Sequence, residues 1–418
     1  MNHDSVRPTP PAVFAVTIVP FAAAIGYVSI AAPFWLKSQG VSLAVIGAIS
    51  ATTMTPHAIK FLWAPLVDIG SYRKVWFVGM TLACAALLGA LALVPDLARH
   101  LGLFTAVATA AQVAGTTACV AADGLMAATT RLEDKGKAGG WRMAGNVGGT
   151  GVLGALALWV ASRASVPAAG AVMAAVTAAS AFAALLIVEP HFRDPAVERA
   201  GSFGRALWVR VRGILDDLWG TVRSRDGWTG LVICALPVGA GALTNLFSAM
   251  AVDYGASEHV VAVVSGLGGG LVGAVGSLVG GYLADHMNRR LAYALSAGIT
   301  ALSAVAMLAA PLTPLTYAWG TLAYNFANGI AFATLAAFIL EMVGHSAAAA
   351  TKYTLFIAIA NVASNYVTAL DGWGSELRGL GARGALIADA VLTFAGIGVL
   401  LGMVALTRRS GSGAAASG

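Results

Sequence analysis

Charged side chains are scarce in this sequence. Only 11% of its 418 residues are Asp, Glu, Lys or Arg, whereas an ordinary soluble domain carries about a quarter. Hydrophobic residues make up 58% of the chain, and the mean hydropathy is +0.79. A water-soluble surface cannot be built from this composition, so the sequence excludes an ordinary soluble protein.

Cysteine and histidine are also few. The three cysteines, Cys84, Cys119 and Cys234, lie inside apolar runs, which provides neither a disulfide framework nor metal-ligand spacing. Of the seven histidines, only His57 lies within a long apolar run. We therefore expect no metal site and no cofactor, and we interpret the cysteines as small packing residues.

Nucleotide-binding and catalytic motifs are missing as well. Gly268, Gly270 and Gly273 spell G-x-G-x-x-G, but a dinucleotide fingerprint needs a preceding strand, a soluble βαβ unit and a later acidic residue. No P-loop occurs, so an ATP-driven pump would need another chain. An enzyme should show convergent nucleophile, base or metal ligands, and a sensor should carry a sizeable soluble domain. The sequence has neither feature.

Long apolar runs are what the sequence does contain. Crossing the hydrocarbon takes about 20 apolar residues, and a helix bonds all of its own backbone groups. The runs predict an all-α integral membrane protein of twelve transmembrane helices. The expected spans are Val13–Trp35, Ser42–Val67, Val75–Val94, Leu103–Thr129, Met143–Ala161, Ala168–Val188, Gly230–Val252, Val260–Leu283, Leu291–Leu312, Tyr317–Met342, Tyr353–Leu370 and Ala385–Leu406.

The distribution of basic residues predicts the orientation. The polar start and the first apolar run lack a small-residue cleavage pattern, so we interpret that run as a first span rather than a signal peptide. With both termini in the cytoplasm, most of the 25 Lys and Arg residues face the cytoplasm. The net charge of +6 is then topological and faces anionic lipid, so nucleic-acid binding need not be invoked.

The chain divides into two six-helix halves. We expect a first half over residues 1–189, a cytoplasmic linker over 190–226, and a second half with a disordered tail over 227–418. The linker places apolar residues at helical spacing among arginines, which is typical of an interfacial amphipathic helix. A solvated connecting loop is the alternative. The spaced apolar residues are Leu207, Val211, Ile214, Leu215 and Leu218.

The two halves also resemble each other. Gln39–Asp68 and Ser257–Asp285 each run from an outer turn, through one span, to an Asp followed by basic residues. Six-span repeats of this kind place a solute site near the membrane midplane, at the interface of the halves. Small residues four apart predict close helix packing. These pairs are Gly145 with Gly149, Gly269 with Gly273, and Gly276 with Gly280.

Several motifs resemble a known family. GGYLADHMNRR at Gly280–Arg290 looks like the inner-loop signature of the major facilitator superfamily. GVSLAVIG at Gly40–Gly47, IKFLWAPLVD at Ile59–Asp68 and GNVGGTGVLGALALWVA at Gly145–Ala161 resemble its muropeptide permease and acetyl-CoA transporter branch. The resemblance covers the first half well and the second half loosely. It implies the major facilitator fold, a monomer, a small-molecule solute as partner, and the bacterial-type inner membrane.

The resemblance breaks in the fourth span. The branch carries a Gln-Asp pair before a second Asp, whereas here only the second, Asp123, remains and Ala118 and Cys119 fill the other positions. Related siderophore permeases make a ferric siderophore a competing cargo to a muropeptide or an acyl-CoA-like compound. We expect a proton-coupled importer. The absence of a Gly-Pro signature in the fifth span favours this over the alternative, a drug or metabolite exporter.

Two polar stripes provide candidate solute or proton sites. Thr53, His57, Lys60, Ala64 and Asp68 share a face of the second span, and Gln112, Thr116, Cys119 and Asp123 share a face of the fourth. A charge in mid-span costs about 2.5–3.5 kcal/mol and usually faces a cavity or a partner. We hypothesise that Lys60 and Asp123 form a coupled pair. Alternatively, Lys60 reaches the inner headgroups, or the pair is purely structural.

The second half carries amides rather than charges. Asn325 and Asn328 share a face of the tenth span with Thr321, and Asn361 and Asn365 share a face of the eleventh with Thr354 and Thr368. Amides donate and accept hydrogen bonds, which suits a polar solute, although they also join neighbouring helices. Asn245 and Tyr27 are further candidates.

Charges at the inner helix ends are candidates for gating. The family resemblance implies that Asp68 with Arg73, and Asp285 with Arg289 and Arg290, hold the halves together in the outward-open state. The alternative is that these charges only set the topology. Glu341 and Asp389 are expected near helix ends, in contact with water.

Overall fold

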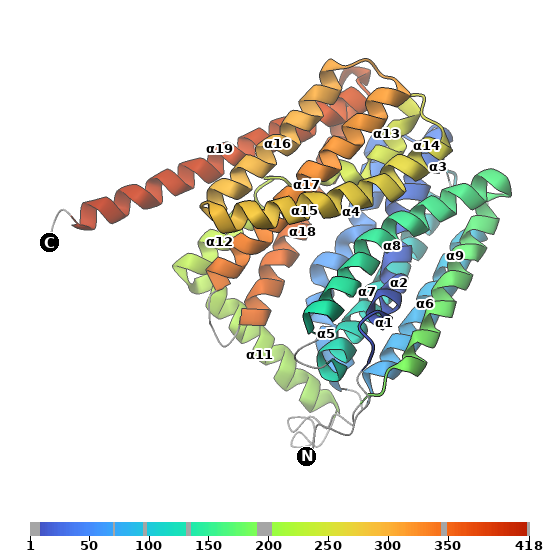
Figure 1. The fold of residues 1–418 in the computed structure, drawn as a ribbon, viewed down its shortest axis with the longest axis horizontal. Coiled ribbons are helices and arrows are strands. Elements are labelled where there is room, and N and C mark those ends of the chain that lie inside the picture. The colour runs from blue at the N-terminus through green and yellow to red at the C-terminus, as the bar shows by residue number, and fades with distance from the viewer. Residues whose placement is uncertain are drawn as a thin grey trace.

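The structure is entirely helical wherever it is described. The computed structural model describes residues 9–69, 72–94, 98–130, 135–189, 203–343 and 349–415. Figure 1 shows two groups of helices that lie side by side, with α11 and the end of α19 projecting from them. Twelve spans form the two six-helix halves that the sequence predicts.

The first half is built from spans one to six. Its first, second and sixth spans are interrupted by short turns of other helix types, whereas the third to fifth are single helices. The elements are α1 (Val13–Thr17), α2 (Val19–Gly26), η2 (Tyr27–Ala31), α3 (Ala32–Ser38), α4 (Leu43–Ile59), η3 (Lys60–Leu62), α5 (Ala64–Ile69), α6 (Arg73–Ala92), α7 (Leu101–Thr129), α8 (Lys135–Arg163), α9 (Val166–Ser180) and η5 (Ala181–Leu186).

The second half follows α11 (Phe203–Arg223), which lies within the predicted linker. Helix α19 continues to Ala415, so the tail that we expected to be disordered from Arg408 is helical as far as that residue. The elements are α12 (Arg225–Ala235), η6 (Ala242–Asn245), α13 (Phe247–Asp253), α14 (Glu258–Val261), η7 (Ala262–Gly268), α15 (Gly269–His286), α16 (Arg289–Ala309), α17 (Pro314–Val343), α18 (Ala349–Glu376), η8 (Leu377–Gly379) and α19 (Ala382–Ala415).

Length and composition alone identify nine of the twelve spans. Within the described ranges, nine helices are long and apolar enough to cross a membrane. The second and seventh spans are broken into shorter pieces, and the eleventh, α18, carries more polar residues. The three spans that escape this criterion all contribute residues to the cavity described below.

The second span breaks near its middle. Pro56 lies inside α4, where its ring removes a backbone hydrogen bond, and the helix ends one turn later at Ile59. The chain then passes through η3 and resumes as α5. We predicted one uninterrupted span from Ser42 to Val67, whereas the structure places Lys60 at the break.

The seventh span also breaks, although the sequence analysis predicted one helix from Gly230 to Val252. Pro237 follows the end of α12, and Gly239 and Gly241 have φ angles of 54° and 64°, which favour glycine. The stretch between Ala235 and η6 is therefore unwound. Non-helical backbone at membrane depth is tolerated where protein or a water-filled cavity surrounds it.

Glycines allow close contact between neighbouring helices. The predicted pairs in α15 are confirmed: a Cβ on Gly276 would lie 2.1 Å from the carbonyl oxygen of Phe326 in α17, and one on Gly280 would lie 2.6 Å from that of Ile330. The pair in α8 packs on the first span, where a Cβ on Gly145 would lie 2.6 Å from the carbonyl oxygen of Ala15. Larger residues would separate these helices.

Two glycine contacts join one half to the other. A Cβ on Gly372 of α18 would lie 2.7 Å from the carbonyl oxygen of Leu43 and 3.2 Å from the Cα of Gly47, both in α4. A Cβ on Gly151 of α8 would lie 2.3 Å from the carbonyl oxygen of Gly266 in η7. Gly47 and Gly266 lie in the two sequence repeats, Gln39–Asp68 and Ser257–Asp285. The halves therefore meet at two related backbone contacts.

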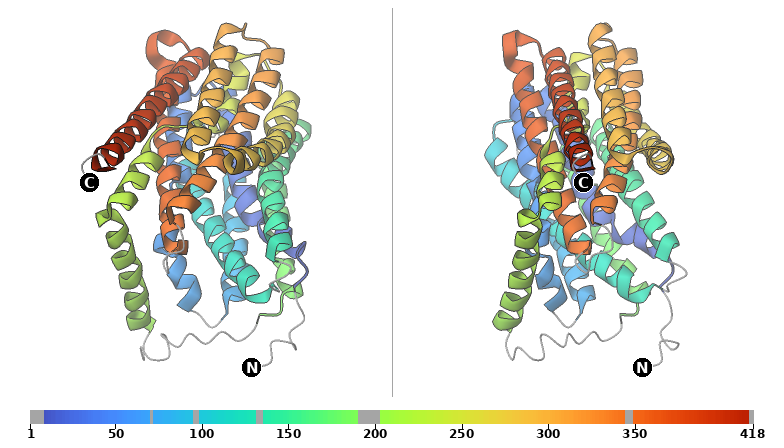
Figure 2. Two further views of the ribbon diagram at one scale, coloured as in Figure 1. Left: turned by 60° about the vertical axis from the view of Figure 1, so that its left-hand side comes forward. Right: turned by 90° about the vertical axis from the view of Figure 1, so that its left-hand side faces the viewer.

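Polar contacts close one end of the molecule. Lys37, at the end of α3, forms a 3.2 Å ion pair with Asp253, at the end of α13. The other Asp253 oxygen accepts a 2.9 Å hydrogen bond from the backbone of Ala382. Nearby, the Ser42 hydroxyl donates to Glu376 over 2.7 Å. Helix α1 begins toward the opposite end, where α11 lies on the outside of the bundle and contacts α5 of the first half (Figure 2).

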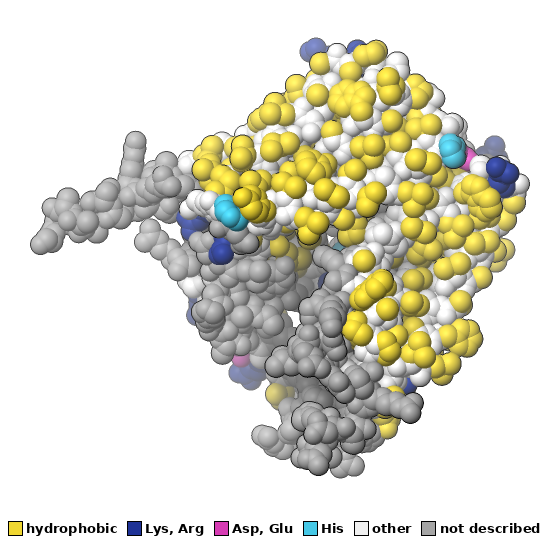
Figure 3. Space-filling view, viewed as in Figure 1, with side chains coloured by type: hydrophobic (Ala, Val, Ile, Leu, Met, Phe, Trp, Pro, Cys, Tyr) yellow, Lys and Arg dark blue, Asp and Glu magenta, His cyan; other side chains and the backbone are white. Residues whose placement is uncertain are grey.

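The outer surface matches a lipid environment. Figure 3 shows hydrophobic side chains spread over the face that includes α8, α9 and α15, with the visible charged groups near its edges. Leu271, Leu278 and Leu315 are 69%, 77% and 75% exposed. Such a large exposed apolar area is stable where lipid covers it.

Candidate functional site

A cavity lies between the two halves. It has a volume of about 230 Å³ and is bounded by α4 on one side and by α12, η6, α16, α17 and α18 on the other. The unwound stretch from Leu236 to Gly241 contributes to its wall. None of the described residues that line it is Asp, Glu, Lys or Arg. Its polar side chains are His57, Thr244, Asn245, Tyr293, Asn328, Asn361, Ser364 and Asn365.

His57 is the cavity residue contributed by the polar stripe of the second span. Its Nε2 lies 3.0 Å from Oε1 of Gln112, and its ring packs against Phe21 with centroids 4.9 Å apart. Gln112 is fully buried. Its side-chain oxygen can only accept a hydrogen bond, so in this arrangement the imidazole Nε2 carries the hydrogen and donates it. Gln112 thereby orients the imidazole from behind the cavity wall.

Asn245 joins the two halves through hydrogen bonds. Its Oδ1 accepts from the Ser29 hydroxyl in η2 over 3.4 Å, and its Nδ2 donates to Oγ1 of Thr368 in α18 over 3.2 Å. Thr368 in turn contacts the carbonyl oxygen of Ala242 over 3.4 Å. This asparagine therefore both lines the cavity and bridges the halves.

The other three cavity asparagines are held less tightly. Asn361 donates to the backbone oxygen of His57 over a long 3.5 Å. The Asn328 amide packs against Gly241, where an added Cβ would lie 2.3 Å from its Oδ1. Asn365 lies one helical turn beyond Asn361 and lines the cavity with it. These amides are available to a solute.

Several predicted residues lie away from the cavity lining. Tyr27 is fully buried, its hydroxyl has no hydrogen-bond partner in the described structure, and its ring packs edge-on against Trp35. Asn325 donates to the backbone of its own helix, at Thr321, over 2.8 Å. The ammonium of Lys60 lies 5.7 Å from the centroid of the Phe21 ring. Phe21 therefore contacts both His57 and Lys60.

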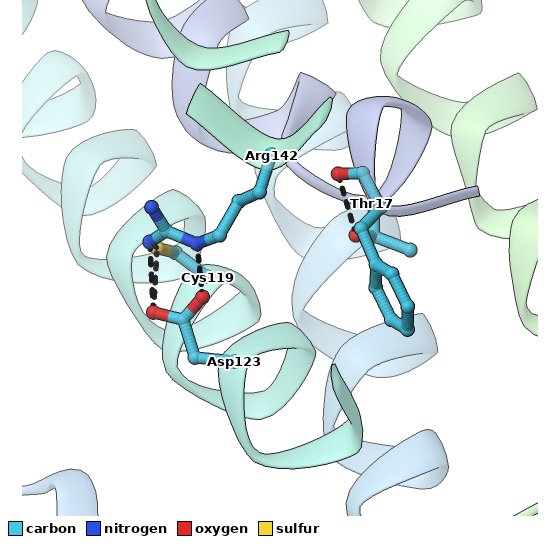
Figure 4. Close-up of polar contacts among 5 residues, drawn as sticks. Thr17, Cys119, Asp123 and Arg142 are labelled. Carbon is cyan, nitrogen blue, oxygen red and sulfur yellow. Dashed lines mark hydrogen bonds and ion pairs between the residues drawn. The ribbon is translucent and has the colours of Figure 1, made fainter. Parts of the chain in front are cut away.

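Asp123 forms its ion pair with Arg142 of α8, which corrects our hypothesis of a pair with Lys60. The Arg142 Nη2 donates to Asp123 Oδ2 over 2.8 Å, and its Nε bonds the other carboxylate oxygen (Figure 4). Arg142 Nη2 also lies 3.3 Å from the Cys119 sulfur. The bidentate geometry is the strongest that an arginine and a carboxylate form.

The sequence contained a signal for this pair. Asp123 precedes the end of α7 by six residues, and Arg142 follows the start of α8 by seven, so an antiparallel arrangement gives them similar depths. We predicted that the fifth span begins at Met143, which left Arg142 in a loop. Helix α8 in fact begins eight residues earlier, at Lys135.

Breaking the Asp123–Arg142 pair is expected to destabilise the fold. The Arg142→Gln variant leaves a carboxylate without its cation. The side chains are 39% and 22% exposed, so the cost should fall between the about 0–1 kcal/mol of a surface pair and the about 3–5 kcal/mol of a buried one. The double variant Asp123→Asn/Arg142→Gln should recover part of the loss in thermal unfolding in detergent. If both variants unfold at the wild-type temperature, the pair contributes nothing to stability.

The predicted gating residues are only partly described. The side chains of Asp68, Asp285 and Glu341 lie outside those that the structure describes. The backbone amides of Arg73 and Lys74 donate to the two Glu189 oxygens over 2.8 and 2.9 Å. The Arg290 guanidinium lies 5.9 Å from the centroid of the Phe338 ring, and Arg289 begins α16. The gating roles of Asp68, Arg73, Asp285, Arg289 and Arg290 stay predictions.

Two buried acids escaped the sequence analysis. Asp389 is 1% exposed, so our expectation that water contacts it was wrong. Asp371 is 0% exposed; we ended the eleventh span at Leu370, whereas α18 continues to Glu376 and includes it. An apolar-run criterion stops at the first charge, so it cannot detect a buried acid at the end of a run.

The described residues hold no group of three or more His, Cys, Asp or Glu side chains that could bind a metal ion. The cavity itself offers amide, hydroxyl and imidazole groups. This arrangement can bind a solute through hydrogen bonds, and it lacks a nucleophile paired with a base.

Comparisons with known proteins agree with this architecture. Residues 13–365 match the family model of the Major Facilitator Superfamily. No curated protein sequence matches the chain. A crystal structure of a mutant of the nucleoside transporter NupG is similar, with a TM-score of 0.69 at 13% identity over 94% of this chain and 98% of that chain.

Two further solved structures share the fold. A bacterial homologue of the human lysosomal transporter Spinster has a TM-score of 0.68 at 13% identity, over 93% of this chain and 95% of that chain. A D-xylose-proton symporter has a TM-score of 0.64 at 14% identity, over 94% and 95%. The family match covers most of the chain, and the folds agree over nearly all of it. The chain therefore belongs to the Major Facilitator Superfamily of membrane transporters.

Proposed function

We propose that this protein is a secondary transporter that takes up a polar solute together with protons by alternating access. The observation that carries the proposal is the cavity between the halves, which four asparagines and His57 line. Amides supply donors and acceptors that can replace the hydration of a polar solute. The cavity lies beside the seam along which the halves would rock.

The lining favours a solute without a large net charge. A strongly anionic cargo would need fixed cations, and no Lys or Arg is among the cavity-lining residues in the part of the chain that the structure describes. Its volume of about 230 Å³ is below the about 300–1,000 Å³ of sites for drug-sized ligands. A sugar-sized or nucleoside-sized solute therefore fits better than the muropeptide, acyl-CoA or siderophore cargoes that the sequence resemblance suggested.

The polar contacts at one end support an inward-open state. Lys37, Ser42, Asp253 and Glu376 all lie at the end that the distribution of Lys and Arg assigns to the outside. The opposite end, where α1 begins, is the one that the same distribution assigns to the cytoplasm. Lys60 and Asp123 remain candidates for proton coupling in the first half, with Arg142 as the partner of Asp123.

Uptake into proteoliposomes tests this function. Purified protein would be reconstituted and offered labelled nucleosides, pentoses, a muropeptide, an acyl-CoA and a ferric siderophore, with and without an inward proton gradient. We expect one small polar solute to accumulate only with the gradient. Accumulation of an anionic cargo instead would contradict the neutral lining, and gradient-independent equilibration would contradict proton coupling.

The Lys37–Asp253 ion pair should stabilise the state closed to the outside. Lys37→Ala removes an ion pair whose side chains are only 19% and 20% exposed. A loss of about 1.4 kcal/mol would shift the balance between the two states tenfold. A cysteine at Asn365 in a cysteine-free background should then react faster with an impermeant maleimide added outside. Lys37→Arg, which keeps the charge, is the matched control; equal labelling rates for the Ala and Arg variants would refute the role of the pair.

A further inference from the structure

Two carboxylic acids lie buried next to each other in the second half. Asp371 of α18 and Asp389 of α19 are 0% and 1% exposed, and neither lines the solute cavity. Their helices, α18 and α19, pack against each other. They lie outside every candidate site considered above.

Close packing of the two helices holds the acids together. A Cβ on Gly384 of α19 would lie 2.3 Å from the carbonyl oxygen of Gly374 in α18, and a Cβ on Gly374 would lie 2.7 Å from the Cβ of Ala388 and 2.9 Å from the carbonyl oxygen of Gly384. Gly374 follows Asp371 by less than one helical turn, and Ala388 directly precedes Asp389. The backbone contact therefore fixes the separation of the carboxyl groups.

The hydrogen bonding of the pair is incomplete. The Tyr324 hydroxyl of α17 donates to both oxygens of Asp389, over 3.0 and 3.2 Å. Both oxygens of Asp371 are buried without a hydrogen-bond partner. Among the described residues, no Lys, Arg or His forms an ion pair with either acid, and Lys37 pairs with Asp253 instead.

Several other ionisable groups on the surrounding helices form hydrogen bonds with residues other than Asp371 and Asp389. His57 bonds Gln112, Glu376 accepts from Ser42, and Tyr317 contacts Ser265. Tyr293 and Tyr366 donate to the backbone oxygens of Val238 and Ala235. The remaining described groups on elements packed against α17, α18 and α19 are Arg205, Arg212, Asp216, Arg223, Cys234, Asp253, Tyr282, His286, Arg289, Arg290, Arg378 and Arg383.

An ionised carboxylate buried without a cation or hydrogen-bond donors is very costly. Two adjacent carboxylates cannot both ionise in a low-dielectric site, so such a pair retains a proton. We propose that Asp371 and Asp389, with Tyr324 as hydrogen-bond donor, form a proton-binding site in the second half, separate from the solute cavity.

The position of the site suits coupling to the solute, an extension that rests on the proposed function. Thr368, which accepts a hydrogen bond from the cavity residue Asn245, lies on α18 one turn before Asp371. Gly372, next to Asp371, forms the backbone contact with α4 between the halves. Separation of the halves at this contact would change the surroundings of Asp371, which gives the proton a state-dependent exit.

Infrared difference spectroscopy of the reconstituted protein, titrated without solute, tests the site directly. We expect a carbonyl band of protonated carboxylic acid that persists at neutral pH in the wild type. The band should be lost in the Asp371→Asn/Asp389→Asn variant and remain in Glu376→Gln, which removes a solvent-accessible acid from the same helix. A neutral-pH spectrum without such a band, or one that the double substitution leaves unchanged, would overturn the inference.

A second measurement separates the site from the proposed function. The titration is repeated with sodium in place of choline, and a band that sodium removes would identify a metal-cation site and overturn proton binding. Uptake of the solute found in the panel should lose its dependence on the proton gradient in Asp371→Asn. If the band is present but the wild type takes up no solute, the proton site stands and the transport proposal fails. If the wild type shows gradient-driven uptake but no such band, the transport proposal stands and the proton site is overturned.

Discussion

Replacing Gly372 by valine is expected to reduce uptake at least tenfold without unfolding the protein. Even its Cβ would lie 2.7 Å from the Leu43 carbonyl oxygen and 3.1 Å from the Ala44 Cα. Both neighbours are backbone atoms, so no side-chain rotation can relieve the overlap. Overpacking of this kind typically costs about 1–3 kcal/mol, and it applies only in the state in which α4 and α18 touch. The variant should therefore favour the state open at this end.

The measurement combines initial uptake rates with cavity labelling from the outside. Gly398→Val is the matched control, because a Cβ there meets nothing within 4 Å. Gly151→Val tests the related contact with Gly266, where the added Cβ would lie 2.3 Å from a carbonyl oxygen. Wild-type uptake in Gly372→Val would mean that the transport cycle does not pass through this tight contact.

Removing two amides from the cavity is expected to lower the apparent affinity for solute roughly tenfold or more. The variant Asn361→Leu/Asn365→Leu keeps side-chain size but deletes two donors and two acceptors. Each lost hydrogen bond is worth about 0.5–1.5 kcal/mol, and 1.4 kcal/mol is a tenfold change in affinity. Thermal stability should change little, since only the long 3.5 Å contact of Asn361 with the His57 backbone is lost inside the protein.

Asn325→Leu provides the control for this experiment. The substitution is chemically the same, but Asn325 lies outside the cavity lining and bonds the backbone of its own helix. Solute concentration curves for uptake should give an unchanged half-saturation for Asn325→Leu and a raised one for the double variant. Equal half-saturation concentrations for Asn325→Leu and the double variant would mean that the solute does not bind beside α18.

The sequence predicted the fold class because hydrophobicity acts over whole segments. A run of apolar residues long enough to span lipid has few alternatives to a helix. The distribution of Lys and Arg between the loops predicts how that helix is oriented in the membrane. The glycine pairs in α15 were predictable for a similar reason, since four-residue spacing puts both on one face. Five of the ten predicted solute or proton residues line the cavity: His57, Asn245, Asn328, Asn361 and Asn365.

Helix ends and pair partners were harder to predict. Local composition placed Arg142 in a loop and Asp371 beyond a span, because each is charged and hydropathy treats a charge as a boundary. Whether such a residue is hydrated depends on what packs against it. Arg142 is stabilised by Asp123 of the preceding helix, 19 residues away in sequence, and Asp389 by Tyr324 of α17.

By itself, the sequence determined that the chain is helical, spans a membrane and repeats a six-span unit, because segment hydrophobicity and periodicity are local properties. Tertiary structure alone decided that Asp123 binds Arg142 rather than Lys60, that the unwound seventh span lines the cavity, and that Asp371 and Asp389 are buried together. Those outcomes depend on how separate helices pack against one another, since burial and charge pairing arise only when separate segments meet.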